Sequence, residues 1–125
     1  MQFLVHYSLH FIFPALIAIA FFKKTWLKVY LFLLSTMLID LDHLLANPIF
    51  DPHRCSIGFH PLHSYYAIAF YFVLLFYPKQ TVKIIALGFV LHILTDLLDC
   101  FLTFSKCHDC FVNAKIHDFF SFMNF

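Results

Sequence analysis

Charged residues are scarce in this chain, and their scarcity narrows the kinds of protein it can be. They make up 12% of the 125 residues, against 62% hydrophobic residues, with 19 Phe and only 2 Gly. A soluble domain carries about 25% charged residues. The balance excludes an ordinary soluble domain and predicts that lipid surrounds most of the protein.

A clustered basic surface is also absent. The formal net charge is +1, and nucleic-acid binding requires basic residues gathered on one face, so no nucleic-acid partner is expected. The start of the chain lacks the positive charge of a secretory signal peptide, because Lys23 and Lys24 follow the first apolar run. We expect that run to be a retained helix.

The chain has no double CxxC framework, internal repeat or interdomain linker. One CxxC is compatible with a disulfide, a metal clip or idle thiols, so the states of Cys55 and Cys100 stay open. For Cys107, His108 and Cys110 a disulfide or an inert tail is favoured over half of a zinc clip. We predict an all-α fold, a polytopic membrane four-helix bundle over residues 1–104, with a tail over 105–125 that forms a short interfacial helix.

Four apolar windows approach the roughly 20 residues that a membrane helix needs. They cover residues 3–22, 26–46, 62–78 and 82–103. Thr25 is expected to cap the second helix, and Pro48 prevents its continuation. Pro61 and Pro78 bracket the third helix in the same way.

Lys and Arg predict the orientation of the bundle. The two loops that must share one side, with the start of the second helix, carry five basic residues, Lys23, Lys24, Lys28, Lys79 and Lys83. The opposite side carries three, Arg54, Lys106 and Lys115. By the positive-inside rule, the side with five is cytoplasmic.

Ionisable side chains gather toward the non-cytoplasmic end of all four predicted helices. They are His6, His10, Asp40, Asp42, His43, His60, His63, His92, Asp96 and Asp99. Such groups in a bilayer cost several kcal/mol each unless they are paired or hydrated, which predicts a shared polar cavity. Pairs spaced by four residues (His6 with His10) or by three (His60 with His63) project from one face of a helix and can reach one ion.

Imidazole combined with carboxylate is typical of zinc sites, and manganese or iron accept the same ligands. The predicted metal ligands are His6, His10, Asp40, His43, His63, His92 and Asp96. They exceed one tetrahedral set, so two or more ions, or one ion with further polar residues around it, are both compatible. An isolated His inside a membrane can instead bond a neighbouring helix, but convergence of the whole set favours metal.

Three further residues have predicted roles beside the metal. Whichever of His60 and Asp42 is not a ligand is the candidate general acid or base. The planar guanidinium of Arg54 is the candidate for holding a phosphate oxygen of the substrate, although its loop position also suits a solvated role.

The motifs resemble those of small bacterial inner-membrane metal-dependent hydrolases. That family has an early His, then P-D-x-D-H, H-R-G-x-T-H-S and H-x-x-x-D segments. The matching segments here are His6 with His10, I-D-L-D-H at 39–43, F-H-P-L-H-S at 59–64 and H-I-L-T-D at 92–96, within roughly residues 5–100. Ile39 replaces the family proline, and His60 and His63 lie closer together than in the family motif.

That family is in turn similar to the zinc-dependent phospholipase C and nuclease group, helical enzymes with clustered His and Asp ligands. The resemblance implies a phosphoester hydrolase of the bacterial inner membrane. Membrane lipid is the expected partner, and a lipid phosphoester is the expected substrate because its headgroup reaches the depth of the ligands. The alternative is a non-catalytic metal-binding or metal-transporting protein. A transporter should carry polar residues through both membrane halves or an inverted repeat, and neither is visible.

Overall fold

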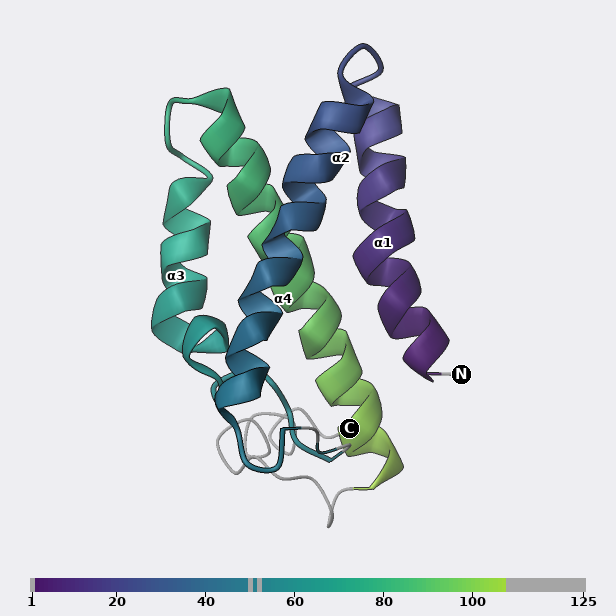
Figure 1. The fold of residues 1–125 in the computed structure, drawn as a ribbon, viewed down its shortest axis with the longest axis vertical. Coiled ribbons are helices and arrows are strands. Elements are labelled where there is room, and N and C mark those ends of the chain that lie inside the picture. Colours follow the sequence, from purple (N-terminus) through teal and green to yellow (C-terminus); the bar gives the residue numbers. More distant parts are fainter. Residues whose placement is uncertain (1, 50, 52, 108–125) are drawn as a thin grey trace.

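The computed structural model describes residues 2–49, 51 and 53–107, and within these residues every regular element is helical (Figure 1). The elements are α1 (Gln2–Phe21), α2 (Trp26–Ser35), η1 (Thr36–Leu45), η2 (Pro61–His63), α3 (Tyr65–Leu74) and α4 (Gln80–Lys106), where η denotes a 3₁₀ helix. The predicted all-α class is confirmed. The predicted interfacial helix of the tail lies outside the described residues.

α4 is the helix on which the others pack. It contacts α1, α2, η1 and α3, and α1 also packs against α2. The α1–α2 and α3–α4 turns lie at one end of the molecule, and the N-terminus and the loop after η1 lie at the other (Figure 1). The two lysine-bearing turns therefore share an end, as the order of the helices predicts.

Gly88 allows α4 to cross close to the junction of α2 and η1. A Cβ atom at Gly88 would lie 2.7 Å from Thr36 Cγ2 and 3.2 Å from Leu33 Cα. The hydroxyl of Thr36 lies 3.1 Å from the same Cβ position and donates a 2.6 Å hydrogen bond to the carbonyl of Leu33 in its own helix. This close contact brings the start of η1 against the middle of α4.

The second predicted helix, residues 26–46, changes its hydrogen-bonding pattern halfway. It is α-helical to Ser35 and 3₁₀ from Thr36 to Leu45. Residues three apart eclipse one another in a 3₁₀ helix, and His43 Nδ1 accordingly lies 3.6 Å from Asp40 Oδ1. Thr25 occupies the predicted N-cap position, although its side chain makes no capping bond.

The third helix is shorter than the predicted window of residues 62–78. The α-helix begins at Tyr65, because Ser64 caps it by accepting a 3.3 Å hydrogen bond from Ala67 N, and it ends at Leu74. Residues 61–63 form η2 instead. Ten α-helical residues extend roughly 15 Å, about half the hydrocarbon thickness of a bilayer, so this segment was predicted too long.

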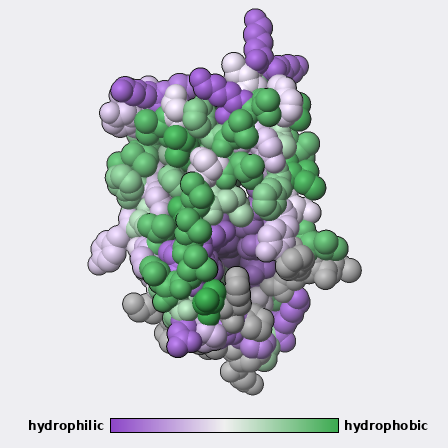
Figure 2. Space-filling view, viewed as in Figure 1, coloured by the Kyte–Doolittle hydropathy of each residue, from purple (hydrophilic) through white to green (hydrophobic). Residues whose placement is uncertain are grey.

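α1 and α4 are long and apolar enough to cross a membrane. Their best windows have mean hydropathies of 1.8 and 2.0, and only 17% of the α1 window is buried inside the molecule. On the face that Figure 2 shows, hydrophobic atoms cover the middle, hydrophilic atoms lie at the end that carries the two turns, and a hydrophilic hollow lies nearer the other end.

A disulfide joins the long loop to α4. Cys55 and Cys100 are bonded with their Cα atoms 5.1 Å apart, and both are buried in the apolar cluster that includes Ile57, Tyr71 and Ile93. Sequence reasoning left the state of these two cysteines open. The bond fixes the loop that carries Ser56 and His60 against the helix that carries His92 and Asp96.

Candidate metal centre

The His and Asp side chains gather in three adjoining groups. The groups are Asp40 with His63, His92 and Asp96; His6 with His10 and Asp96; and Asp42 with His43 and His60. Within each group, one candidate ligand atom per residue lies within 4.8 Å of all the others. The groups contain all seven predicted ligands and both predicted acid–base residues.

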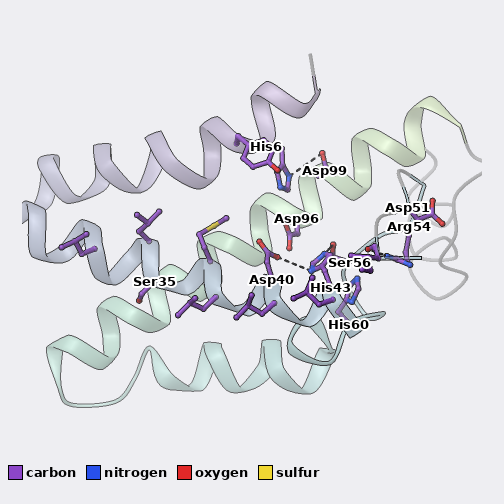
Figure 3. A pocket seen from close by; sticks show the side chains of 18 residues that line it. His6, Ser35, Asp40, His43, Asp51, Arg54, Ser56, His60, Asp96 and Asp99 are labelled. Atoms are coloured by element: carbon purple, nitrogen blue, oxygen red, sulfur yellow. Dashed lines mark hydrogen bonds and ion pairs between the residues drawn. The ribbon is translucent and has the colours of Figure 1, made fainter. Parts of the chain in front are cut away.

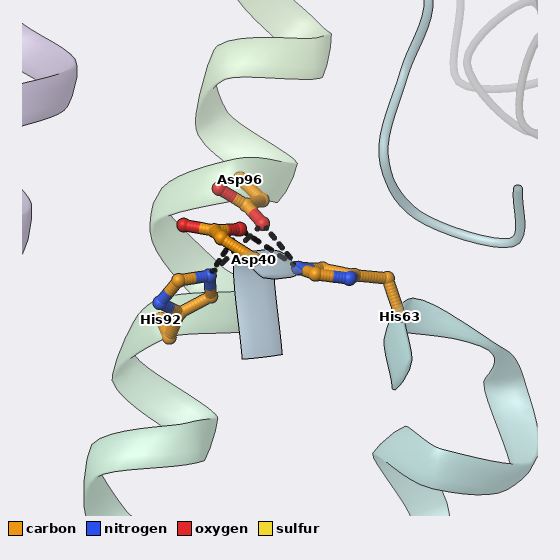
Figure 4. Close-up of side chains that lie close together, drawn as sticks. All are labelled: Asp40, His63, His92 and Asp96. Atoms are coloured by element: carbon orange, nitrogen blue, oxygen red, sulfur yellow. Dashed lines mark hydrogen bonds and ion pairs between the residues drawn. The ribbon is translucent and has the colours of Figure 1, made fainter. Parts of the chain in front are cut away.

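The central group sets two imidazoles against two carboxylates (Figure 4). His63 Nε2 lies 3.0 Å from Asp96 Oδ2 and 3.5 Å from Asp40 Oδ1. His92 Nε2 lies 3.1 Å from Asp40 Oδ1 and 3.5 Å from Asp96 Oδ2. Tetrahedral zinc, with nitrogen and oxygen ligands at about 2.0–2.2 Å, requires ligand atoms roughly 3.3–3.6 Å apart. The four measured separations lie within or slightly below that range.

Two buried atoms of this group face each other without a hydrogen bond. His63 Nε2 and Asp96 Oδ2 make no hydrogen bond with any residue that the structure describes, although they lie 3.0 Å apart. His63 is 0% exposed and Asp96 is 4% exposed. Two buried lone pairs at this distance repel unless a proton or a cation lies between them. A bound cation would resolve this conflict.

Asp42 orients His63 from behind. Asp42 Oδ2 accepts a 2.8 Å hydrogen bond from Leu62 N and lies 3.1 Å from His63 Nδ1. Because a carboxylate only accepts, we assign the His63 proton to Nδ1, which leaves Nε2 with the lone pair that a metal ligand needs. Histidine ligands of metals are commonly held by a carboxylate in this way.

Asp96 belongs to two groups at once. Its Oδ2 faces His63, whereas its Oδ1 lies 3.4 Å from His10 Nε2. The rings of His10 and His6 lie 4.4 Å apart, and His6 Nδ1 lies 3.8 Å from Asp99 Oδ1. A carboxylate that presents its two oxygens to two ligand groups can bridge ions about 3.5–4 Å apart.

The third group is built on stacked rings. The His43 and His60 rings lie 3.9 Å apart at 27°, and His43 Nε2 lies 3.0 Å from Ser56 Oγ. Asp42 Oδ1 lies 3.2 Å from His43 Nδ1. Burial, with a further contribution from His43, lowers the pKa of His60 to about 4. The His60 imidazole is therefore neutral near neutral pH and can accept a proton or bind a metal.

Some residue pairs that their spacing along a helix predicts to bind one ion fall in the same group, and others do not. His6 with His10, and His92 with Asp96, each fall in one group. His60 and His63 are divided between groups, with ring centroids 6.0 Å apart, because residues 61–63 form a 3₁₀ turn rather than the start of α3. No group among the described residues contains both His60 and His63, so their expected sharing of one ion stays a prediction.

A cavity of about 1010 Å³ opens beside the groups (Figure 3). Its polar lining includes His6, Asp40, His43, His60, Asp96 and Asp99. Of the other grouped residues, His10, Asp42, His63 and His92 are buried behind this wall. A molecule in the cavity therefore reaches one side of the ligand groups, while the protein interior holds the other side.

Arg54 lines the same cavity but is already engaged. Its guanidinium donates hydrogen bonds of 2.8 Å to Pro48 O and 2.7 Å to Ile49 O, and lies 4.8 Å from the centre of the Phe59 ring. Two of five N–H donors are thus used to hold the loop. Its predicted phosphate contact stays a prediction.

Sequence reasoning did not assign roles to three residues around the groups. Ser56 bonds His43, Asp99 faces His6, and Cys55 anchors the loop between them. Asp99 carried a signal, since it follows Asp96 by three residues on the same helix. Ser56 carried none, because its place depends on how the loop folds back onto η1.

Comparison with known proteins places the chain in a family. Residues 1–103 match the model of a family of unknown function, DUF6122, and the chain belongs to that family. No curated protein and no solved structure matches it. The matched segment contains every residue of the three groups.

Proposed function

We propose that this member of the DUF6122 family is an integral membrane hydrolase that uses a divalent metal, zinc in the first instance, to cleave a phosphoester. The observation that carries the proposal is the buried approach of His63 Nε2 to Asp96 Oδ2, 3.0 Å apart and without hydrogen bonds among the described residues. A cation between the two atoms would remove the repulsion of their lone pairs, as would a proton on His63 Nε2, and the metal analysis below distinguishes the two.

Zinc is proposed first because the central group offers two nitrogens and two oxygens with N–O separations close to those of a tetrahedral site. Manganese and iron accept the same atoms but favour higher coordination numbers. The shared position of Asp96 supports a second ion beside the first. The group of Asp42, His43 and His60 supports a further ion or a polar wall.

A bound divalent ion would acidify a water molecule and polarise a phosphoryl oxygen. We assign proton transfer to His60, which is neutral and lies in the cavity wall. Asp42 is assigned to positioning, because its Oδ2 already holds His63 Nδ1. Arg54 would bind a phosphate oxygen through the donors that its loop contacts leave over.

The proposed location is the bacterial inner membrane, with the ligand groups on the non-cytoplasmic side. Lysines gather at the opposite end of the bundle, which the positive-inside rule makes cytoplasmic. The Cys55–Cys100 disulfide lies at the end of the ligand groups, and disulfides persist in oxidising compartments. Both arguments give the same orientation.

Metal transport is the rival proposal. A transporter needs polar groups along a path through the membrane. Among the described residues, the buried ionisable side chains are His10, Asp42, His60, His63, His92 and Asp96. All of them belong to the three groups, so they form a closed cluster at one end and favour a site over a path.

The test combines metal analysis with turnover. The purified protein would be analysed for bound metal by mass spectrometry and assayed for hydrolysis of a soluble phosphodiester and for headgroup release from mixed phospholipids. His92→Ala should lose metal and turnover, whereas His53→Ala, at an exposed loop position outside the groups, should keep both. Bound metal without turnover in the wild type would support a non-catalytic metal protein.

A further inference from the structure

The cavity beside the ligand groups is polar at one end and apolar along the rest. Asp40, His43 and Asp96 contribute to the polar end. The apolar part follows α2 and η1, where the lining includes Leu31, Leu34, Leu38 and Leu41. In Figure 3 the labelled polar side chains other than Ser35 gather toward one end, while Ser35 and further lining side chains continue along the helix.

The leucines form a stripe along one helical segment. They recur at spacings of three and four residues, which keeps them on one side of the helix. Leu31 is 56% exposed and Leu38 is 65% exposed, so no element of the described chain covers this wall. The apolar part of the cavity therefore opens sideways, toward lipid if the bundle lies in a membrane.

The dimensions suit a hydrocarbon chain attached to a polar group. The rise per residue of the two helix types places Leu31 roughly 15 Å from Asp40 along the axis. The cavity volume of about 1010 Å³ lies at the upper end of the range for small-molecule sites, about 300–1,000 Å³. A small soluble phosphoester would fill only the polar end.

We infer that the apolar part of the cavity holds one hydrocarbon chain of an amphiphilic phosphoester, with the phosphate at the polar end. This rests on the proposed function for the identity of the polar group. A chain that enters from the bilayer moves from one apolar environment to another. The apolar part of the cavity, called the groove below, therefore adds little hydrophobic free energy to binding. Its effect is positional: it holds the phosphate beside the ligands, while the chain runs along α2 toward Leu31.

Photoreactive alkyl phosphonates, which cannot be hydrolysed, test this inference in the full metal-loaded protein in lipid nanodiscs. One probe carries a diazirine at the end of the chain and another carries it next to the phosphonate. The first should label residues 31–38 and the second residues 40–44, as read by peptide mass spectrometry. Excess alkyl phosphonate without a photoreactive group should abolish the labelling by both probes. Labelling spread over the outer faces of α1 and α4, insensitive to competitor, would overturn the inference.

Two leucines of similar exposure provide the matched variants. Leu31 and Leu27 both lie on α2 and are 56% and 54% exposed, but only Leu31 lines the cavity. Leu31→Trp should reduce labelling by the chain-end probe severalfold, and Leu27→Trp should leave it unchanged. Equal effects of the two variants would contradict the inference. Leu38→Trp provides a second block at an exposed position should Leu31→Trp fold poorly.

Failure of the groove and failure of the proposed function give different results. Site-specific labelling without hydrolysis of any phosphoester would support binding of the chain in the cavity and contradict the proposed hydrolase activity. Hydrolysis of a soluble phosphodiester without site-specific labelling would support the hydrolase activity and contradict binding of the chain in the cavity.

Discussion

Asp42 Oδ2 lies 3.1 Å from His63 Nδ1, and the opposite nitrogen of the same ring lies 3.0 Å from Asp96 Oδ2. The carboxylate of Asp42 thus sets both the tilt of the ring and the place of its proton. Asp42 also accepts a hydrogen bond from Leu62 N, so the backbone of η2 holds the carboxylate in turn. The position of His63 is determined by contacts outside the central group.

We predict that Asp42→Asn weakens metal binding by about 10–100-fold, the usual loss when the partner of a histidine ligand is removed. The neutral amide of Asn is a weaker acceptor than the carboxylate for the hydrogen bonds from His63 Nδ1 and Leu62 N. Competition with a chelator would measure the affinity, and circular dichroism would establish that the helices are retained. Asp51→Asn is the control, since that carboxylate accepts a 2.9 Å bond from His53 N and lies outside the groups. Equal affinity of the two variants would contradict the assigned role.

The shared carboxylate of Asp96 predicts unequal effects on metal stoichiometry. His6→Ala removes a member of one group, whereas Asp96→Asn disturbs two groups. We expect His6→Ala to lose one equivalent of metal and Asp96→Asn to lose two, measured by elemental mass spectrometry after dialysis. Identical losses in the two variants would exclude the bridging arrangement.

Gly88→Ala should destabilise the bundle by about 1–3 kcal/mol, the usual cost of overpacking. The new methyl group would lie 2.7 Å from Thr36 Cγ2. The free energy of unfolding in mixed micelles measures the loss. Adding Thr36→Ser removes Cγ2 and should recover part of it, although Leu33 Cα remains close. If Thr36→Ser changed the stability of the wild type and of the Gly88→Ala variant by the same amount, the contact with Thr36 Cγ2 would not be the cause of the destabilisation.

Loss of the disulfide should cost about 2–4 kcal/mol of stability, because the bond closes a loop with a sequence separation of 45. Cys55→Ala, Cys100→Ala and the double variant should show similar losses, since each removes the same bond. Unfolding measurements on all three provide the check. Losses that add in the double variant would mean that packing, rather than the bond, is the source.

Much of the candidate site followed from helix order and depth. Helices that alternate in direction bring the start of the first, the end of the second, the start of the third and the end of the fourth to one side. His6, Asp40, His63 and Asp96 occupy those positions, and the structure gathers them. Simple geometry sufficed because, among the described residues, the His and Asp side chains lie toward one end of the helices, while the lysines of the two turns lie at the other.

The details that escaped prediction depend on tertiary contacts. The change to 3₁₀ geometry at Thr36 coincides with the close crossing at Gly88, which no local propensity encodes. The pairing of Cys55 with Cys100 depends on how the long loop folds back. The start of α3 at Tyr65 did have a local signal. Ser64 is a residue type that favours the N-cap position, but the predicted apolar window included it inside the helix.

The position of His92 and Asp96 on α4 has a consequence for the order of assembly during synthesis. The central group and the group of His6 and His10 both include Asp96, which lies on α4, the last of the helices in the described part of the chain. Neither can be completed while only α1, α2 and α3 have been translated. Under the proposed function, α4 would therefore have to pack against the other helices before either group could bind an ion, and a chain truncated before residue 92 would lack ligands from both groups.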